Sequence, residues 1–375
     1  MDIYNTSYKS EYDDEDNDNA FEGPFDPNNI DVDISVVNLG SLLEMLEYGE
    51  IDLSPDFQRE SDLWSIKQKS RLIESVLLGL PLPSFYFSED PNTKKLVVVD
   101  GLQRLCAFND FWIKKTLRLE GMQFLTNLNG KSIKDLDRTQ IRRIKSLKIT
   151  LNSLRKETPT NVKYVLFQRI NTAGLPLSQQ EMRNALYQGK ATDLLKRMVT
   201  LASFEDVIGY RLDKRRMTDC YFANRFLAFH LNKDKYNGDI NSFMGDVLAQ
   251  VNQMNDKDID SIKESFDRAM IVCYAVFGKE AFVRYSIKKS KNNKFKYKLS
   301  RPLFDALSVS IANLTAQQQN MLVERKSVFN NIIQSQLQEG DFIKSITSNA
   351  TTTSDVKLRF SIISNAINDV LNNDY

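Results

Sequence analysis

The sequence predicts an α+β fold, with a mixed N-terminal domain of strands and helices followed by a mainly helical C-terminal domain. Two observations predict this class. Short apolar runs rich in β-branched residues alternate with helical patterns over residues 31–155, whereas nearly every pattern from residue 191 onward repeats with the period of an amphipathic helix. The chain has 375 residues, enough for each domain to bury a core of its own. The domain boundaries are therefore placed at 31–155 and 156–375.

The first thirty residues differ in composition from the rest of the chain. Residues 1–30 hold nine acids and one lysine, a net charge of −8, so the remaining chain carries +9. They lack apolar periodicity, and a disordered acidic tail is predicted. A basic body with an acidic tail fits nucleic-acid or nucleotide binding, although solvated surface charges explain it equally well.

The predicted elements of the N-terminal domain begin near Val32. Ser41 and Glu44 form a capping-box pattern, which predicts a helix over residues 41–48. An irregular segment over residues 53–64 precedes a helix over residues 66–79, which stops at Gly79. Strands are predicted over residues 85–87 and 96–99.

The stretch KKLVVVDGLQRLCAFNDFW, residues 94–112, predicts a strand, a tight turn and a helix. Asp100 is placed to accept from amides at the helix start, and Gly101 allows close approach to the backbone. Gln103 and Arg104 project donors from the first helical turn. Such a corner suits an anion, most readily a phosphate. Asp-Gly is also a common turn dipeptide, so a purely structural role stays open.

After Trp112, most apolar patterns of the sequence predict helices. A small basic helix is predicted around Arg142, Arg143 and Lys145, among short strands. A helix over residues 161–170 is expected to end at Gly174. Ser178 and Glu181 form a second capping box, which predicts a helix over residues 179–187. Apolar residues at helical spacing then continue to the end of the chain.

Histidine and cysteine usage excludes several classes of site. The chain has a single histidine, His230, which excludes an HNH nuclease, an HExxH metalloprotease and other two-histidine mechanisms within it. His230 lies on an apolar helical pattern, and a packed position is expected. Cys106, Cys220 and Cys273 are far apart among apolar neighbours, so reduced core thiols are expected. No apolar run is long enough to span a bilayer, and a cytoplasmic protein is expected.

Three blocks in order and spacing resemble the DGQQR-motif family, the N-terminal domain of GmrSD-type modification-dependent restriction enzymes, whose fold is similar to ParB and sulfiredoxin. The blocks are LSPDFQRESDLW with LIESVLLGLPLPSFYF, then VVVDGLQRL, then LFQRINTAGLPLSQQEMRNAL. The resemblance implies a ParB-like nucleotide-binding domain, with possible magnesium-dependent NTP hydrolysis, in bacterial or phage-related DNA defence.

The resemblance also implies roles for individual residues. The DGQQR motif falls on Asp100, Gly101, Leu102, Gln103 and Arg104, of which Asp100, Gln103 and Arg104 are the catalytic candidates. The nucleotide-binding candidates further include Gln58, Arg59, Asn171 and Thr172. Arginines suit phosphate oxygens through bidentate hydrogen bonds, and Asp100 suits a magnesium-bound or attacking water. A protein cage for the metal is not expected.

Two departures limit what the resemblance implies. Leu102 stands where the family has its first glutamine, which places hydrolysis in question more than binding. The full restriction enzymes carry an HNH nuclease, which this chain lacks the histidines to form. Two arrangements therefore stay open: a stand-alone sensor or regulatory subunit, or a nuclease on a separate chain.

A second candidate surface is the segment RYSIKKSKNNKFKYKLSR, residues 284–301, with eight basic residues and no acid. Lysines for phosphates and aromatics for base stacking are typical of nucleic-acid grooves. The DNA-binding candidates are Lys288, Lys289, Lys291, Lys294, Lys296 and Lys298, although a solvated hairpin tip fits the same residues.

The combined prediction is a nucleotide-binding sensor or regulatory protein of a restriction system. DNA is its expected partner, and the sequence is compatible with a homo-oligomer. The alternative is a non-enzymatic DNA-binding adaptor with a ParB-like fold. Arg183, Asp219 and Arg225 correspond to family residues that face the cleft, but from the sequence alone they are helix-surface charges.

Overall fold

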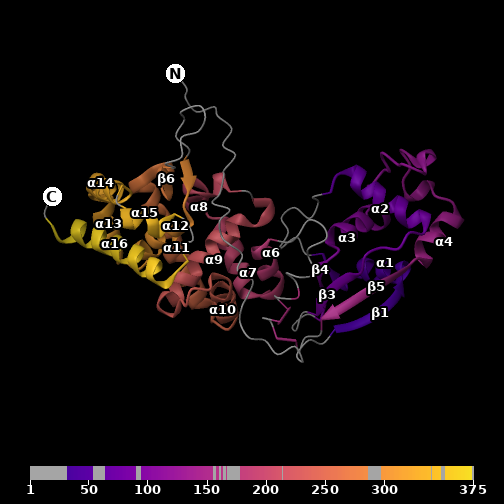
Figure 1. The fold of residues 1–375 in the computed structure, drawn as a ribbon, viewed down its shortest axis with the longest axis horizontal. Helices are drawn as coiled ribbons and strands as arrows, with labels where there is room; N and C mark the ends of the chain where they lie inside the picture. Colours follow the sequence, from indigo (N-terminus) through magenta and orange to yellow (C-terminus); the bar gives the residue numbers. More distant parts are fainter. Residues whose placement is uncertain are drawn as a thin grey trace, which may run out of the picture. The chain divides into compact units, whose positions relative to one another are not determined.

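The computed structural model describes residues 32–53, 64–89, 94–154, 158–159, 162–163, 166, 178–212, 214–285, 297–338, 340–347 and 351–373. These residues form two compact units (Figure 1). The N-terminal unit contains the described residues up to 188 together with 215–217, and the helical unit contains those of 189–214 and 218–373. The N-terminal unit thus continues beyond residue 155, where the sequence pattern placed the end of the first domain.

The N-terminal unit contains a mixed five-stranded sheet in the order β1-β5-β3-β4-β2. The strands are β1 (Val32–Asn38), β2 (Ile51–Asp52), β3 (Phe85–Glu89), β4 (Leu96–Asp100) and β5 (Lys148–Leu154). β1 pairs with β5 and β3 with β4 in antiparallel fashion, whereas β3–β5 and β2–β4 are parallel pairs. Together with the helices, this sheet confirms the α+β class.

Four helices of this unit share one apolar core with the sheet. They are α1 (Leu39–Glu47), α2 (Ile66–Leu78), α3 (Leu102–Phe108) and α4 (Arg138–Ser146). Leucines of α1 and α2 pack there with Phe85, Phe87 and Val98 of the central strands. Val97 and Val99 point to the opposite face of the sheet by strand alternation, and they are buried too. Helix α6 (Gln179–Leu186) also contacts β4. Strand β4 is therefore buried on both faces, as its continuous apolar sequence predicts.

The helix ends test the predicted caps. Gly79 ends α2 in the left-handed conformation, with φ of 77°, as predicted. Ser178 and Glu181 form the predicted capping box at the start of α6. The capping box predicted from Ser41 is wrong, because α1 begins at Leu39 with Asn38 as its N-cap and no side-chain cap. The Leu39 amide instead donates to the Leu147 carbonyl, a tertiary contact that starts the helix two residues earlier.

The segment between α3 and α4 contains helical turns, so the short strands predicted there are wrong. Polar side chains of α2 hold this segment in place. A π-helical turn (Asn109–Ile113) extends α3, and two 3₁₀ turns follow, Thr126–Leu128 and Ile133–Asp135. The buried Glu74 carboxylate accepts from the amides of Gln123, Phe124 and Leu125. Lys69 pairs with Asp110 at 2.6 Å. These contacts satisfy backbone groups that lie outside regular structure.

The helical unit is built as the sequence pattern predicts, with one short hairpin. Its helices are α7 (Lys190–Val199), α8 (Ala202–Val207), α9 (Thr218–Asn232), α10 (Ile240–Asn252), α11 (Asp256–Phe277), α12 (Arg301–Ala312), α13 (Ala316–Glu324), α14 (Lys326–Gln336), α15 (Gly340–Ile346) and α16 (Thr353–Asn372). Strands β6 (Val283–Tyr285) and β7 (Tyr297–Leu299) form the antiparallel hairpin. Edge-to-face aromatic pairs such as Phe226 with Phe266, whose ring centroids lie 4.8 Å apart, join α9 to α11.

The expectations for histidine and cysteine are confirmed. The His230 ring stacks on Phe226, with ring centroids 5.0 Å apart. Cys106, Cys220 and Cys273 are buried free thiols. Among the described residues, no helix has both the length and the apolar character needed to cross a membrane.

Candidate functional site

The corner between β4 and α3 depends on a glycine. Gly101 has φ of +100°, a conformation that side chains rarely adopt, and it precedes the first residue of α3. A Cβ atom at this position would lie 2.5 Å from Cδ1 of Phe85 and 3.1 Å from Nη2 of Arg104. The sequence suggested that Gly101 admits a ligand to the backbone. In the structure, the Phe85 ring and the Arg104 guanidinium lie against this glycine.

Arg104 is buried beneath the corner and donates to three protein acceptors. Its guanidinium donates to the Pro83 carbonyl, to the Ser84 carbonyl at 3.1 Å and to Asp100 Oδ2 at 2.9 Å. It also lies over the Phe85 ring, 4.3 Å from the centroid. Burial lowers the Arg104 pKa, while the Asp100 charge acts in the opposite direction. The arginine thus ties the loop before β3 to the β4–α3 turn.

Asp100 and Gln103 occupy the more accessible side of the corner. The Asp100 side chain is 32% exposed and is held by Arg104 four residues later. It does not cap α3, whose N-cap is Gly101. The Gln103 side-chain oxygen accepts from the Trp64 amide at 3.2 Å. Gln103 therefore connects the corner to the residue that directly follows segment 54–63, which carries Gln58 and Arg59.

Leu102 is buried in the core with α1 and α2. This position therefore contributes packing rather than a polar group. The other predicted site residues lie outside the described residues: Gln58, Arg59, Asn171, Thr172, Lys288, Lys289, Lys291, Lys294 and Lys296. Lys298 lies in β7, but its side chain is not described.

Helix α6 carries buried polar side chains that the sequence pattern did not reveal. Arg183 is fully buried and donates to Gln179 at 3.2 Å, so its assignment as a surface charge is wrong. Burial raises the pKa of Glu181, although Arg216 at 3.3 Å opposes this shift. An amphipathic pattern indicates which face of a helix is apolar, but it does not indicate that the polar face is covered as well.

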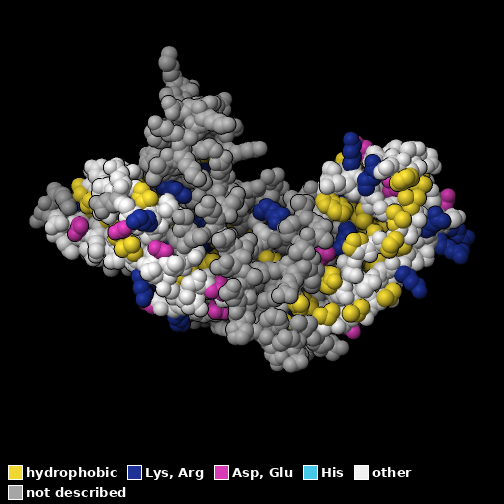
Figure 2. Space-filling view, in the orientation of Figure 1, with side chains coloured by type: hydrophobic (Ala, Val, Ile, Leu, Met, Phe, Trp, Pro, Cys, Tyr) yellow, Lys and Arg dark blue, Asp and Glu magenta, His cyan; other side chains and the backbone are white. Residues whose placement is uncertain are grey.

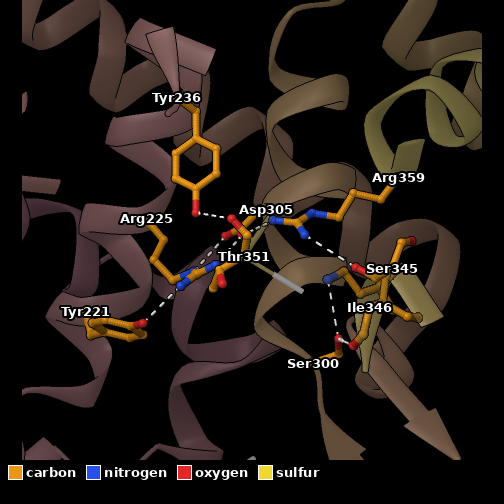
Figure 3. Close-up of polar contacts among 10 residues, drawn as sticks. Tyr221, Arg225, Tyr236, Ser300, Asp305, Ser345, Ile346, Thr351 and Arg359 are labelled. Carbon is orange, nitrogen blue, oxygen red and sulfur yellow. Dashed lines mark hydrogen bonds and ion pairs between the residues drawn. The ribbon is translucent and has the colours of Figure 1, made fainter. Parts of the chain in front are cut away.

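The helical unit contains a second buried charge cluster, centred on Asp305 of α12 (Figure 3). Arg225 of α9 donates to both Asp305 oxygens, at 3.0 and 2.6 Å, and to the Tyr221 hydroxyl at 2.9 Å. Arg359 of α16 donates to Asp305 at 3.5 Å and to the Ser345 carbonyl at 3.3 Å. Arg225 and Asp219 are both buried, so their assignment as helix-surface charges is also wrong.

The cluster joins helices that are distant in sequence. Beside it, the Tyr236 hydroxyl donates to the Thr351 carbonyl at 2.6 Å, and the Ser300 hydroxyl donates to the Ile346 carbonyl at 3.2 Å (Figure 3). Burial lowers the pKa of Arg359 to about 10, against the attraction of Asp305. Burial likewise raises the pKa of Tyr236 to about 12. We assign this cluster a structural role.

At the β4–α3 corner, the Asp100 carboxylate and the Gln103 side-chain amide are the groups available to a ligand. Within the described parts of the chain, no group of three or more histidine, cysteine, aspartate or glutamate side chains is arranged to hold a metal ion. Magnesium in phosphate-transfer sites commonly takes only one or two protein carboxylates and binds substrate phosphates as well. Asp100 fits that donor requirement.

Comparison with known proteins identifies the N-terminal unit. Residues 39–188 match the family model described as GmrSD restriction endonuclease, N-terminal domain. The match ends at the same residue as the main segment of the compact N-terminal unit. Searches of curated proteins and of solved structures found no match. The segment from α1 through α6, with the Asp100–Arg104 corner inside it, thus matches the model of GmrSD restriction endonuclease N-terminal domains.

Proposed function

We propose that the N-terminal unit binds a nucleoside triphosphate together with magnesium at the Asp100–Arg104 corner, and that it acts as a sensor or regulatory domain in DNA restriction or phage defence. The family of residues 39–188 supports a role in a restriction system. Within that role, DNA is the expected partner, and an HNH nuclease acting with this domain would be a separate chain, since this sequence has a single histidine.

The observation that carries the proposal is the position of the Asp100 carboxylate. It is one-third exposed at the end of a doubly buried strand, and a buried arginine fixes it from beneath. A carboxylate fixed in this way loses little side-chain entropy when it binds a cation, which favours binding. Bound magnesium would neutralise phosphate charge and polarise the terminal phosphoryl group.

The remaining residues take roles that follow from their contacts. Arg104 positions Asp100, since its guanidinium already binds two backbone carbonyls and the carboxylate. Gln103 connects the ligand corner to Trp64 and so to the segment with Gln58 and Arg59. Arg59 is proposed to bind phosphate oxygens, and Gln58, Asn171 and Thr172 complete the proposed site. These four assignments rest on the family motif.

A second candidate function is supported by two contacts. Arg104 is fully engaged within the protein, and Leu102 is buried in the core. These two observations fit a β4–α3 corner with a structural role alone, in a protein that binds DNA as an adaptor. The two functions differ in whether nucleotide binding depends on Asp100.

The test is binding of ATP and GTP to the full chain by isothermal titration calorimetry, with magnesium and with EDTA. We expect binding that requires magnesium and falls at least about tenfold in Asp100→Asn, because a neutral amide is a weaker magnesium ligand than a carboxylate. Phosphate release, measured with and without DNA, reports whether the bound nucleotide is hydrolysed.

The matched control is Asp137→Asn, which removes an exposed carboxylate from the N-cap of α4 and leaves a residue that caps equally well. Its nucleotide affinity should equal that of the unmodified protein. Absence of ATP and GTP binding in the unmodified protein, or equal binding by Asp100→Asn, would overturn the nucleotide proposal and favour the adaptor.

A further inference from the structure

The strongest concentration of charge among the described residues is a basic segment that the proposed nucleotide site does not use. Residues 114–148 hold ten lysines and arginines against three acids, a net charge of +7, whereas the whole chain has +1. All of these residues are described. Lysine and arginine side chains gather over α4, at the right edge of the view in Figure 2.

Helix α4 aligns three of these cations on one face. Arg138, Arg142 and Lys145 lie at positions i, i+4 and i+7, and all three are exposed. At 1.5 Å rise per residue they span about 10 Å along the helix. Ile144 lies on the buried side. Arg143 points elsewhere and donates to the Leu77 carbonyl of α2 at 3.1 Å. We call Arg138, Arg142 and Lys145 the α4 stripe.

The stripe cations are not paired with acids. Across the parts of the chain that the structure describes, none of Arg138, Arg142 and Lys145 has a carboxylate oxygen within 4.0 Å, so none forms an ion pair. Lys145 lies over the Trp112 ring, 5.5 Å from its centroid. Surface cations are usually balanced by neighbouring acids on the same face, and an unbalanced row attracts polyanions.

The acids of the segment are committed to other contacts. Asp137 caps α4 by accepting from the Gln140 amide at 2.8 Å. Asp135 accepts from the amide and hydroxyl of Ser132, which lowers its pKa, as do the nearby charges of Lys131 and Arg118. Glu120 lies 4.0 Å from Lys67. The segment's ten cations still outnumber these three acids, so the net charge around the α4 stripe is positive.

Helix α1, which packs against α4, adds two exposed acids, Glu44 and Glu47. Neither forms an ion pair with the stripe. Further along the chain, Lys148 begins β5 directly after α4 and is exposed. The basic surface thus continues beyond the stripe toward the edge pair of strands β1 and β5.

We infer that the α4 stripe, with the flanking cations Lys134 and Lys148, contacts the phosphate backbone of duplex DNA. A rigid row of arginines and lysine on a folded helix matches the regular phosphate spacing of a duplex, and such contacts position DNA without reading its sequence. The inference rests on the proposed role in DNA restriction. It is independent of the nucleotide site and of the lysines between residues 288 and 298.

The test uses the full chain and a fluorescent 20-base-pair duplex, with anisotropy measured over a range of NaCl concentrations. The variant is Arg138→Gln, Arg142→Gln, Lys145→Gln, which removes three charges and retains helix propensity. We expect affinity to fall about tenfold or more at 0.1 M salt. The slope of log K against log salt should become shallower by about 2.7, since each phosphate contact contributes about 0.9. Two unrelated duplex sequences should lose equal affinity.

The matched control is Lys257→Gln, Lys326→Gln, Lys357→Gln, which removes three exposed cations of the helical unit that form no ion pair with any described residue. Its affinity and salt slope should stay near those of the unmodified protein. Circular dichroism and thermal unfolding establish that both variants are folded. An equal loss in both variants would mean a nonspecific charge effect, and an unchanged stripe variant would mean that DNA binds elsewhere. Either result overturns the inference.

Failure of the inference and failure of the proposed role give different results. If the unmodified protein binds no duplex at any salt concentration, DNA engagement itself is wrong. The unmodified protein could instead bind DNA and lose affinity only when the lysines between residues 288 and 298 are substituted. In that case the restriction role stands and the α4 stripe is not the contact. Binding of DNA that is unaffected by Asp100→Asn separates this surface from the nucleotide site.

Discussion

At the residue scale, Gly101 shows how a backbone turn and the packing around it depend on the same residue. Its positive φ turns the chain from β4 into α3, and its missing side chain leaves room for the Phe85 ring and the Arg104 guanidinium. Arg104 in turn holds Asp100 at the accessible side of the turn. The motif residues thus depend on one another through contacts of a few ångströms.

Gly101→Ala should lower the free energy of unfolding by about 2–5 kcal/mol. A residue with a side chain is strained at this φ by about 1–2 kcal/mol, and overpacking against Phe85 adds about 1–3 kcal/mol. Gly130→Ala is the control, because Gly130 also has positive φ but open space around it, so only the backbone strain applies. Urea unfolding of both variants checks the difference, and equal losses would contradict the packing argument.

The pH dependence at His230 follows from its burial. Burial lowers the His230 pKa below its usual 6.5, while a hydrogen bond with Asn313 acts in the opposite direction. Nδ1 is buried and has no hydrogen-bond partner among the residues that the structure describes. As the pH falls below 6.5, the unfolded chain takes up the proton before the folded chain does. The contribution of His230 to stability is therefore full above pH 6.5 and declines as the pH falls toward the folded pKa.

Because the chain has a single histidine, NMR of its imidazole protons measures this pKa without assignment ambiguity. We expect a titration midpoint below 6.5 in the folded protein. His230→Gln should lose less stability than the unmodified protein between pH 7 and pH 5.5. A midpoint at or above 6.5 would show that the ring is solvated or paired with a charge.

At the element scale, long-range polar contacts hold the helices in register. Glu74 of α2 binds three consecutive amides of the segment before α4, and Asp305 of α12 binds arginines of α9 and α16. Apolar packing alone tolerates sliding of one helix along another, whereas a buried ion pair with defined hydrogen bonds does not. The buried charges therefore favour one arrangement of the helices over its neighbours.

Asp305→Ala should destabilise the helical unit by about 3–5 kcal/mol, because it leaves the buried guanidiniums of Arg225 and Arg359 without their counter-charge. Asp256→Ala is the matched control, since it breaks the exposed Lys190–Asp256 pair of 2.8 Å, and its cost should be at most about 1 kcal/mol. Thermal unfolding compares the two. Similar small losses would mean that water or rearranged side chains replace Asp305.

At the scale of the whole molecule, the chain contains two compact units, each with its own core. Proteins of this kind commonly depart from a single two-state transition, because each unit unfolds with its own enthalpy. The family match covers residues 39–188, which lie in the N-terminal unit, and does not extend into the helical unit.

Differential scanning calorimetry should therefore resolve two transitions. Asp305→Ala should move one of them and Gly101→Ala the other, since the two residues lie in different units. Addition of magnesium and ATP should raise only the transition that Gly101→Ala lowers, by mass action on the folded N-terminal unit. A single transition moved by both substitutions would show that the units unfold together.

The sequence predicted the elements whose causes are local. The apolar run of β4, the left-handed glycine that ends α2 and the capping box of α6 all follow from residues within a few positions of one another. The packed positions of His230 and the three cysteines follow from their apolar neighbours in the same helical pattern. The resemblance to the restriction-enzyme domain likewise followed from blocks of the sequence, and the family match over residues 39–188 confirms it.

The sequence alone did not determine what covers each polar face, because that depends on segments far apart in the chain. Arg183, Asp219 and Arg225 have the spacing of surface charges, yet all are buried. Arg104 has the position of a phosphate ligand, but tertiary contacts with Pro83, Ser84 and Phe85 engage it within the protein. The charges of α4 could be counted in the sequence, whereas only the folded chain shows that their acidic neighbours are committed elsewhere. Local free energies fix where helices and strands form, and long-range packing decides which charges remain accessible to a ligand.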